Sequence, residues 1–203
     1  MALAEFFSQV PRIQLRDPLS EFLGAADGGL MEYGYADAVR LAGHSCPTVA
    51  GSYLMVRAAL RALYGEEVPE RGAIEISMSG AEGEGTTGVI AQVFTLLTGA
   101  AAQNGFHGIG GRFVRNGLLH YGSGNQSCIA SFKRMDTGAK VDVSMDLSSI
   151  PPAPNMRLLM GQAMAPDATA EIRKAFGQVW QDRVRRLLLE HADDPQVIRV
   201  VRR

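Results

Sequence analysis

One short stretch joins the two helices around which this chain is organised: Leu41-Ala42-Gly43-His44-Ser45-Cys46-Pro47-Thr48. The residues from Tyr35 to Ala42 predict a short helix, and Gly43 is the residue type that often follows a helix end. Pro47 suits the first position of a new helix. Apolar residues then recur at helical spacing, at Val49, Tyr53, Val56, Leu60 and Leu63. The stretch therefore predicts a long helix from Pro47 to Gly65, with Cys46 as its N-cap.

Outside these helices the pattern favours strands first and further helices later. Ile74, Ile76 and Met78 alternate with polar residues, as in a strand. Asn116-Gly117 between apolar pairs is a strong hairpin signal. Further strands are predicted over 127–135 and 141–147, and a terminal edge strand near Ile198. A buried helix is predicted over 89–98. A C-terminal helix is indicated by an apolar stripe at Ile172, Phe176, Val179 and Leu187. Segregated helices and hairpin-linked strands indicate an α+β fold. We expect a mostly antiparallel sheet packed against the long helix, with additional N- and C-terminal helices.

Length and composition indicate one globular domain. The chain has 203 residues, of which 46% are hydrophobic. We expect a single domain over 1–203, with a core over about 35–147 and a helical extension over about 155–203. The net charge of -1 gives no general field for nucleic acid or membranes. No apolar run approaches the ~18 residues of a spanning helix, and Met1 to Val10 lacks a signal-peptide pattern. We expect a cytoplasmic protein with reduced thiols.

The pair His44 and Cys46 is the main candidate for chemistry. A cysteine at a helix N-terminus faces the positive end of the helix dipole, which favours the thiolate. Thiolate and neutral imidazole are both good ligands for zinc or a similar metal. The pair supplies only two donors, however, and a metal site usually has three or four. On spacing alone, a functional site and a buried thiol beside a hydrogen-bonded histidine are equally plausible.

Further donors would have to come from the glycine-rich loops. Gly83-Glu84-Gly85-Thr86-Thr87-Gly88 matches a dinucleotide-binding pattern, but carboxylates would repel a pyrophosphate, and the acidic residue expected ~20 positions later is missing. We interpret the segment as a tight strand-to-helix turn. Glu84 is the first candidate for a third ligand or a general base, followed by Glu82 and His107.

Three other groups of residues suggest structural roles. Arg112, Arg115, Lys133 and Arg134 make the predicted hairpin region cationic, and scattered solvent-facing charge is the simpler interpretation than an anion site. The run Arg183, Arg185 and Arg186 is interpreted as a solvated helix face. Cys128 is expected in mid-strand as a buried apolar residue.

The order of these motifs resembles the FmdE-like family, whose members are related to a component of formylmethanofuran dehydrogenase. The resemblance rests on Gly43-His44-Ser45-Cys46-Pro47, the long helix with Arg57, Leu97-Thr98-Gly99, Gly110-Gly111-Arg112 and the segment from Lys133 to Gly138. It covers about 35–147. It implies an α+β fold, a tendency to form homodimers and a metal site, usually zinc, that involves His44 and Cys46.

These observations lead to three hypotheses. The first is a metal-binding FmdE-like protein that holds zinc or another divalent transition metal through His44, Cys46 and Glu84. It would have a pocket for an unknown small molecule at the N-terminus of the long helix, and would form a homodimer without nucleic-acid or membrane partners. The second is a metal-free thiol enzyme in which Cys46 is the nucleophile and His44 its base. The third is a non-catalytic cofactor-binding subunit. Whether the protein is an enzyme stays open.

Overall fold

The computed structural model describes residues 3–203 and has the predicted α+β architecture, with two sheets. In the smaller sheet, β1 (Ile13–Arg16) pairs antiparallel with β2 (Leu30–Tyr33). The larger sheet has the strand order β4-β3-β5-β6-β7, and only β3 and β4 run parallel. Its strands are β3 (Ile74–Met78), β4 (Leu119–His120), β5 (Ala130–Arg134), β6 (Lys140–Met145) and β7 (Ile198–Arg202). The expected terminal edge strand is thus confirmed, whereas the sequence did not predict the smaller sheet.

Six α-helices connect and cover these sheets within residues 3–203. They are α1 (Pro18–Phe22), α2 (Tyr35–Ala42), α3 (Pro47–Tyr64), α4 (Thr87–Thr98), α5 (Met156–Met164) and α6 (Ala170–Arg185). Short 3₁₀ helices cover Glu5–Gln9 and Asp27–Gly29, and a π-helical turn over Arg186–Glu190 continues α6. Within the described part of the chain, every helix is too short or too polar to cross a bilayer.

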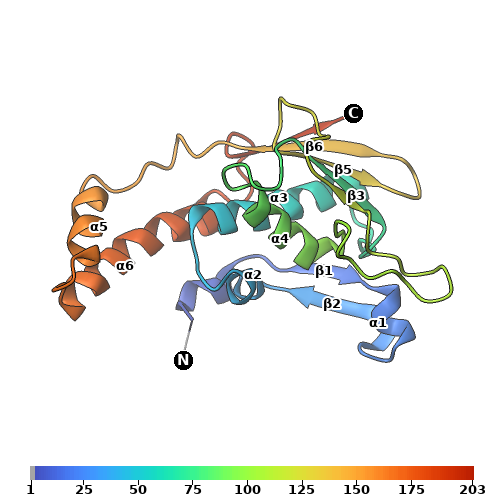
Figure 1. The fold of residues 1–203 in the computed structure, drawn as a ribbon, viewed down its shortest axis with the longest axis horizontal. Helices are drawn as coiled ribbons and strands as arrows, with labels where there is room; N and C mark the ends of the chain where they lie inside the picture. Colours follow the sequence, from blue (N-terminus) through green and yellow to red (C-terminus); the bar gives the residue numbers. More distant parts are fainter. Residues whose placement is uncertain (1–2) are drawn as a thin grey trace.

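The central helix α3 has the predicted bounds and lies in the middle of the molecule. In Figure 1, α3 and α4 form a layer between the larger sheet and the ribbon of β1 and β2. Most of α3 is buried, including Val49, Tyr53 and Val56. Gly51 lets β6 approach closely, since a Cβ at this position would overlap the sulfur of Met145.

The C-terminal helices form an extension of the molecule. α5 and α6 pack against each other, and in Figure 1 they project past the body at the end away from the larger sheet. The extended segment with Pro151, Pro152 and Pro154 connects β6 to α5. The C-terminal end of α6 returns to the body, where it contacts α3. Side chains near the C-terminal end of α6 therefore lie close to the start of α3.

The hairpin predicted at Asn116-Gly117 is wrong. Both residues form a turn, but the strand that follows, β4, pairs in parallel with β3. The backbone N–H of Asn116 donates to Phe106 O at 3.1 Å, and that of Gly117 donates to Ala102 O at 3.0 Å. The segment before β4 thus finds its hydrogen-bond partners in the loop after α4, which local turn propensity does not reveal.

Two further expectations for this region are also corrected. Cys128 precedes β5 and is partly exposed, and its thiol donates to Asn125 O at 3.1 Å. Arg115 is buried, and Arg134 lies over the ring of Tyr64 at 4.0 Å. Arg134 also pairs with carboxylates, as does Lys133. Three of the four cations expected here, Arg115, Lys133 and Arg134, are therefore paired with carboxylates.

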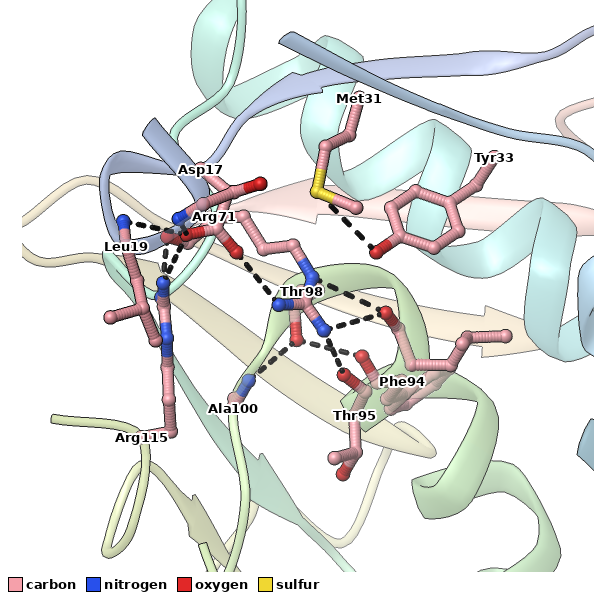
Figure 2. A network of polar contacts seen from close by, with 12 residues as sticks. Asp17, Leu19, Met31, Tyr33, Arg71, Phe94, Thr95, Thr98, Ala100 and Arg115 are labelled. Atoms are coloured by element: carbon pink, nitrogen blue, oxygen red, sulfur yellow. Dashed lines mark hydrogen bonds and ion pairs between the residues drawn. The ribbon is translucent and has the colours of Figure 1, made fainter. Parts of the chain in front are cut away.

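Asp17 forms the buried ionic centre of the fold (Figure 2). Its carboxylate accepts hydrogen bonds from the backbone of Leu19 and Ser20, so it caps α1. It also pairs with Arg71 at 2.8 Å and with Arg115 at 2.7 Å, and its side chain is only 4% exposed. One carboxylate therefore joins α1 to two segments far away in the sequence.

Arg71 extends this network to the end of α4. Its guanidinium donates to Leu96 O at 3.0 Å, and so binds a carbonyl in the last turn of that helix. The backbone of the same residue pairs with β1, because its N–H donates to Arg16 O at 2.9 Å. Arg115 in turn donates to the carbonyl oxygen of Arg71. The small sheet, α4 and the loop before β4 are thereby fixed to one another.

The charge balance of the network determines how Asp17 titrates. Burial by itself raises the pKa of this carboxyl. The hydrogen bond from Arg71, the charge of Arg115 and the backbone bond from Ser20 outweigh burial, so the pKa falls below the ordinary value of 3.8. Asp17 is therefore ionised in the folded protein at neutral pH.

Replacement of Asp17 by alanine should lower the free energy of unfolding by about 3–5 kcal/mol, because it leaves two arginines at a buried site without their counter-charge. Urea denaturation measures the change. The control is Asp27→Ala, which removes an exposed carboxylate in the same connection between β1 and β2. A loss in Asp17→Ala no larger than that in Asp27→Ala would contradict the role of the network.

The stability difference between wild type and Asp17→Ala should also depend on pH, in a direction set by the lowered pKa of Asp17. Because the folded-state pKa of Asp17 is lowered, its contribution is fully present above 3.8 and disappears as the pH falls through the folded-state pKa. The stability difference between wild type and Asp17→Ala should therefore narrow below pH 3.8.

Candidate functional site

The segment between α2 and α3 is shaped by the caps of both helices. Gly43 adopts the left-handed conformation, with φ 73°, and its N–H closes α2 by donating to Val39 O at 2.9 Å. Cys46 is the N-cap of α3, with extended backbone, and Pro47 is the first helical residue. The Cys46 sulfur accepts from the N–H of Val49 at 3.5 Å. The predicted helix ends and the position of the thiol are thus confirmed.

Ser45 connects this segment to α6. Trp180 Nε1 and Gln181 Nε2 both donate to the carbonyl oxygen of Ser45, at 2.9 and 3.1 Å. The Ser45 hydroxyl donates to Gln181 Oε1 at 3.0 Å. Burial raises the pKa of Tyr35, so its hydroxyl stays protonated and donates to Ser45 Oγ at 2.8 Å. The position of the whole segment therefore depends on two side chains from the C-terminal extension.

His44 and Cys46 do not form a catalytic pair in this arrangement. The His44 ring is exposed, and its Nδ1 lies 2.9 Å from Ala42 O. A carbonyl oxygen only accepts, so Nδ1 carries the proton and Nε2 is the free acceptor. Throughout residues 3–203, no hydrogen bond joins this ring to the Cys46 thiol. The thiol enzyme of the second hypothesis therefore lacks its expected base contact.

The other expected donors lie in separate loops. Glu84 is exposed, and its carboxylate accepts from the N–H of Ala81 at 3.0 Å, so it closes its own turn. His107 is exposed in the loop after α4. Within the described residues, no three histidine, cysteine, aspartate or glutamate side chains gather as a metal site would require. The role of His44, Cys46 and Glu84 in metal binding therefore stays a prediction.

A hollow of about 420 Å³ lies directly beside the segment, between the start of α3, the proline-rich connection, α5 and α6. Pro47 and Trp180 form part of its wall, so it adjoins both the N-cap of α3 and the contact with Ser45. The remaining wall is mostly apolar and includes Pro152, Met156 and Met160. The hollow thus lies at the N-terminus of the long helix, and the ligand pocket expected there stays a prediction.

Two arginines supply the charge of this hollow. Arg157 is exposed on α5, and Arg183 comes from α6, where its Nε donates to Ile150 O at 2.7 Å. Burial, and then the charge of Arg186, lowers the pKa of Arg183. Within residues 3–203, no carboxylate lies within ion-pair distance of Arg157 or Arg183. The hollow thus combines an apolar wall with uncompensated positive charge.

Comparisons with known proteins leave the family open. No family model matches the chain, and no curated protein matches it. Among solved structures, the chain is similar to a tungsten formylmethanofuran dehydrogenase FmdE-like protein from Syntrophus aciditrophicus. The identity is 15%, the TM-score is 0.46, and the match covers 84% of this chain and 72% of the other. A similarity at this level supports no conclusion about activity, and membership of the FmdE-like family stays a prediction.

The sequence did not predict that residues of α5 and α6 line this hollow. The run Arg183, Arg185 and Arg186 reads in the sequence as one solvated face, but the three residues differ. Arg185 and Arg186 pair with acids on their own helical segment, whereas Arg183 turns to the hollow. The single tryptophan of the chain, Trp180, was a usable signal, because an indole on a polar helix often contacts another segment.

Replacement of Gln181 by alanine should speed alkylation of Cys46 by roughly fivefold or more, because each hydrogen bond that holds Ser45 contributes about 1 kcal/mol. The rate is measured with iodoacetamide in a Cys128→Ser background, in which Cys46 is the single thiol. Gln178→Ala, an exposed change on the same helix, is the control. Equal rates in Gln181→Ala and the control would show that α6 does not hold the segment.

Proposed function

We propose that this protein binds a small apolar molecule with an anionic group in the hollow between α3, α5 and α6. The observation that supports the proposal is the presence of two arginines that have no acidic partner among residues 3–203, in an otherwise apolar wall. Guanidinium groups that no carboxylate of the fold engages remain free to bind an anion. A carboxylate or phosphate supplies the counter-charge, and guanidinium groups bind both in bidentate fashion.

The dimensions and side chains also fit such a ligand. A volume of about 420 Å³ lies within the usual range of small-molecule sites, about 300–1,000 Å³. Met156 and Met160 are flexible and adapt to ligands of different shape. Trp180 and the prolines offer rigid apolar surface. We therefore favour a medium-length acyl or aromatic carboxylate, or a phosphate ester of similar size.

The position of the thiol favours binding over catalysis. Pro47 contributes to the wall, but Cys46 is not among the residues that line the hollow. His44 is exposed and bonded to Ala42 O. Neither residue of the predicted catalytic pair is thus placed against the ligand. This arrangement supports a binding role more than the thiol enzyme of the second hypothesis, and the cofactor-binding subunit of the third hypothesis stays a prediction.

Octanoate should bind saturably and change the fluorescence of Trp180, the only tryptophan of the chain. Arg157→Ala should weaken this binding about tenfold or more, because hydrogen bonds to charged groups contribute about 1.5–3 kcal/mol. The matched control is Arg173→Ala, which removes an exposed arginine of α6 that does not line the hollow. Octylammonium is the ligand control.

Three results would contradict this proposal. The first is a fluorescence signal that does not saturate with octanoate. The second is octylammonium binding as tight as octanoate binding, since the arginines should repel a cation. The third is an equal loss of affinity in Arg157→Ala and Arg173→Ala, which would indicate a general effect of charge on the extension.

A second candidate function is metal binding by His44 and Cys46, as the resemblance implies. The contact between His44 Nδ1 and Ala42 O favours it, because histidine ligands commonly donate their second ring nitrogen to a carbonyl and so orient the other. Nε2 and the Cys46 sulfur are then two available donors. The remaining positions of a zinc ion would need water or donors outside the described residues of this chain. The homodimer implied by the resemblance likewise stays a prediction.

Zinc should slow alkylation of Cys46 in the Cys128→Ser protein, because a metal-bound thiolate is a poorer nucleophile. His44→Ala should weaken this protection about tenfold or more, since it removes one of two protein donors. His107→Ala serves as the control, because it removes an exposed histidine of another loop. If zinc leaves the rate unchanged, or protects His44→Ala equally well, this second candidate is wrong.

A further inference from the structure

A second, polar groove lies at the carboxyl ends of the parallel strands β3 and β4. The chain continues from β3 into the loop of residues 79–86 and from β4 into residues 121–124. These two loops lie side by side, since Gly122 N–H donates to Gly80 O at 2.9 Å and Ser123 N–H donates to Met78 O at 3.1 Å. Adjacent loops after parallel strands commonly form ligand sites, because both turn outward at the same edge.

The groove consists of two adjoining hollows. One has a volume of about 610 Å³ and lies against β4 and the loop that follows it. The other has a volume of about 320 Å³ and reaches Gln92 on α4. They share Glu82, Ala102, Asn104 and Tyr121. The shared residues place one carboxylate, one amide and one phenol at the centre of the groove.

These polar side chains are available to a ligand. Across residues 3–203, no intramolecular hydrogen bond involves the side chain of Glu82, Gln92, Gln103, Asn104 or Tyr121. Neighbouring polar side chains do form such bonds. Glu84, on the same loop as Glu82, bonds the N–H of Ala81, and Asn125 bonds Asp142. The groove is thus lined by donors and acceptors that the fold itself does not use.

The central pair of the groove combines a donor with an acceptor. Burial, and then the charge of Glu82, raises the pKa of Tyr121. The phenol therefore remains protonated and donates, while the Glu82 carboxylate accepts. The Tyr121 ring also gives an aromatic surface next to these groups.

The chemistry of the lining disfavours anions, metal ions and purely apolar ligands. An anion would meet the carboxylate of Glu82, and the guanidinium of Arg71, which borders one hollow, is already paired with Asp17. A metal ion would find no group of three acidic, histidine or cysteine side chains in the described residues. An apolar molecule would desolvate Glu82, Asn104 and Tyr121 without replacing their bonds to water, which is costly.

We propose that this groove binds a neutral polyhydroxylated ligand of the monosaccharide class. Neighbouring hydroxyl groups of a sugar both donate and accept, which matches the carboxylate, amides and phenol of the lining. The carbon-bound hydrogens of a pyranose ring give an apolar face that packs against the Tyr121 ring. The site is independent of the anionic-ligand pocket, since the two share no lining residue.

Isothermal titration of the full chain with methyl glucoside, methyl galactoside and methyl mannoside tests this proposal. At least one of the three should bind saturably. Glu82→Gln should weaken that binding about tenfold, because it replaces a charge-assisted hydrogen bond with a neutral one, and Tyr121→Phe should weaken it about fivefold, since it removes a neutral hydrogen bond. Glu84→Gln is the matched control on the same loop and should leave the affinity unchanged, because Glu84 faces its own turn.

The outcomes separate this site from the pocket between α3, α5 and α6. Arg157→Ala should leave glycoside binding unchanged, and Glu82→Gln should leave octanoate binding unchanged. The proposal is overturned if none of the three glycosides binds. It is also overturned if binding persists at full strength in both Glu82→Gln and Tyr121→Phe, or if Glu84→Gln weakens it as much as they do. Thermal melting of each variant identifies any loss that comes from unfolding.

Discussion

The carboxylate of Asp17 is the interaction on which the arrangement of the molecule depends. It caps α1 and binds two guanidinium groups that arrive from the loop before β3 and the loop before β4. A buried ion is costly unless every partner is in place, so the site strongly disfavours other arrangements of these segments. Because Arg71 also binds the last turn of α4, the network fixes the helix that borders the polar groove.

The arginines fall into two groups. Those paired with carboxylates stabilise the fold, and those without an acidic partner among residues 3–203 are available to a ligand. Arg115 is buried against Asp17, and Arg134 is paired with Glu67 and Asp136. Within residues 3–203, Arg157 and Arg183 have no such partners, although the residue type is the same. An unpaired guanidinium beside apolar surface is available to bind an anion. The same distinction applies in the polar groove. The Glu84 carboxylate accepts a hydrogen bond from its own loop, whereas the Glu82 carboxylate has no hydrogen-bond partner within residues 3–203.

The parts of the site that the sequence predicted correctly are those set by neighbours a few residues away. Gly43 ends α2, and Cys46 caps α3, because each of these bonds spans at most four residues. The hairpin at Asn116-Gly117 failed because a turn signal does not specify which strand pairs next. Glu84 is a plausible ligand in the sequence because its carboxylate has no evident partner there, whereas the bond to Ala81 N–H that engages it depends on the shape of the loop.

The sequence by itself determined the α+β class, the ends of α2 and α3, and the placement of His44 and Cys46 at the joint between them. These features follow from hydrophobic periodicity and from caps within a single turn. Only the tertiary structure decided that α6 holds Ser45 from 136 positions away, that Asp17 binds two distant arginines, and which polar groups stay unpaired. The physical reason is that burial and charge compensation depend on which segments pack together, and local sequence does not encode that choice.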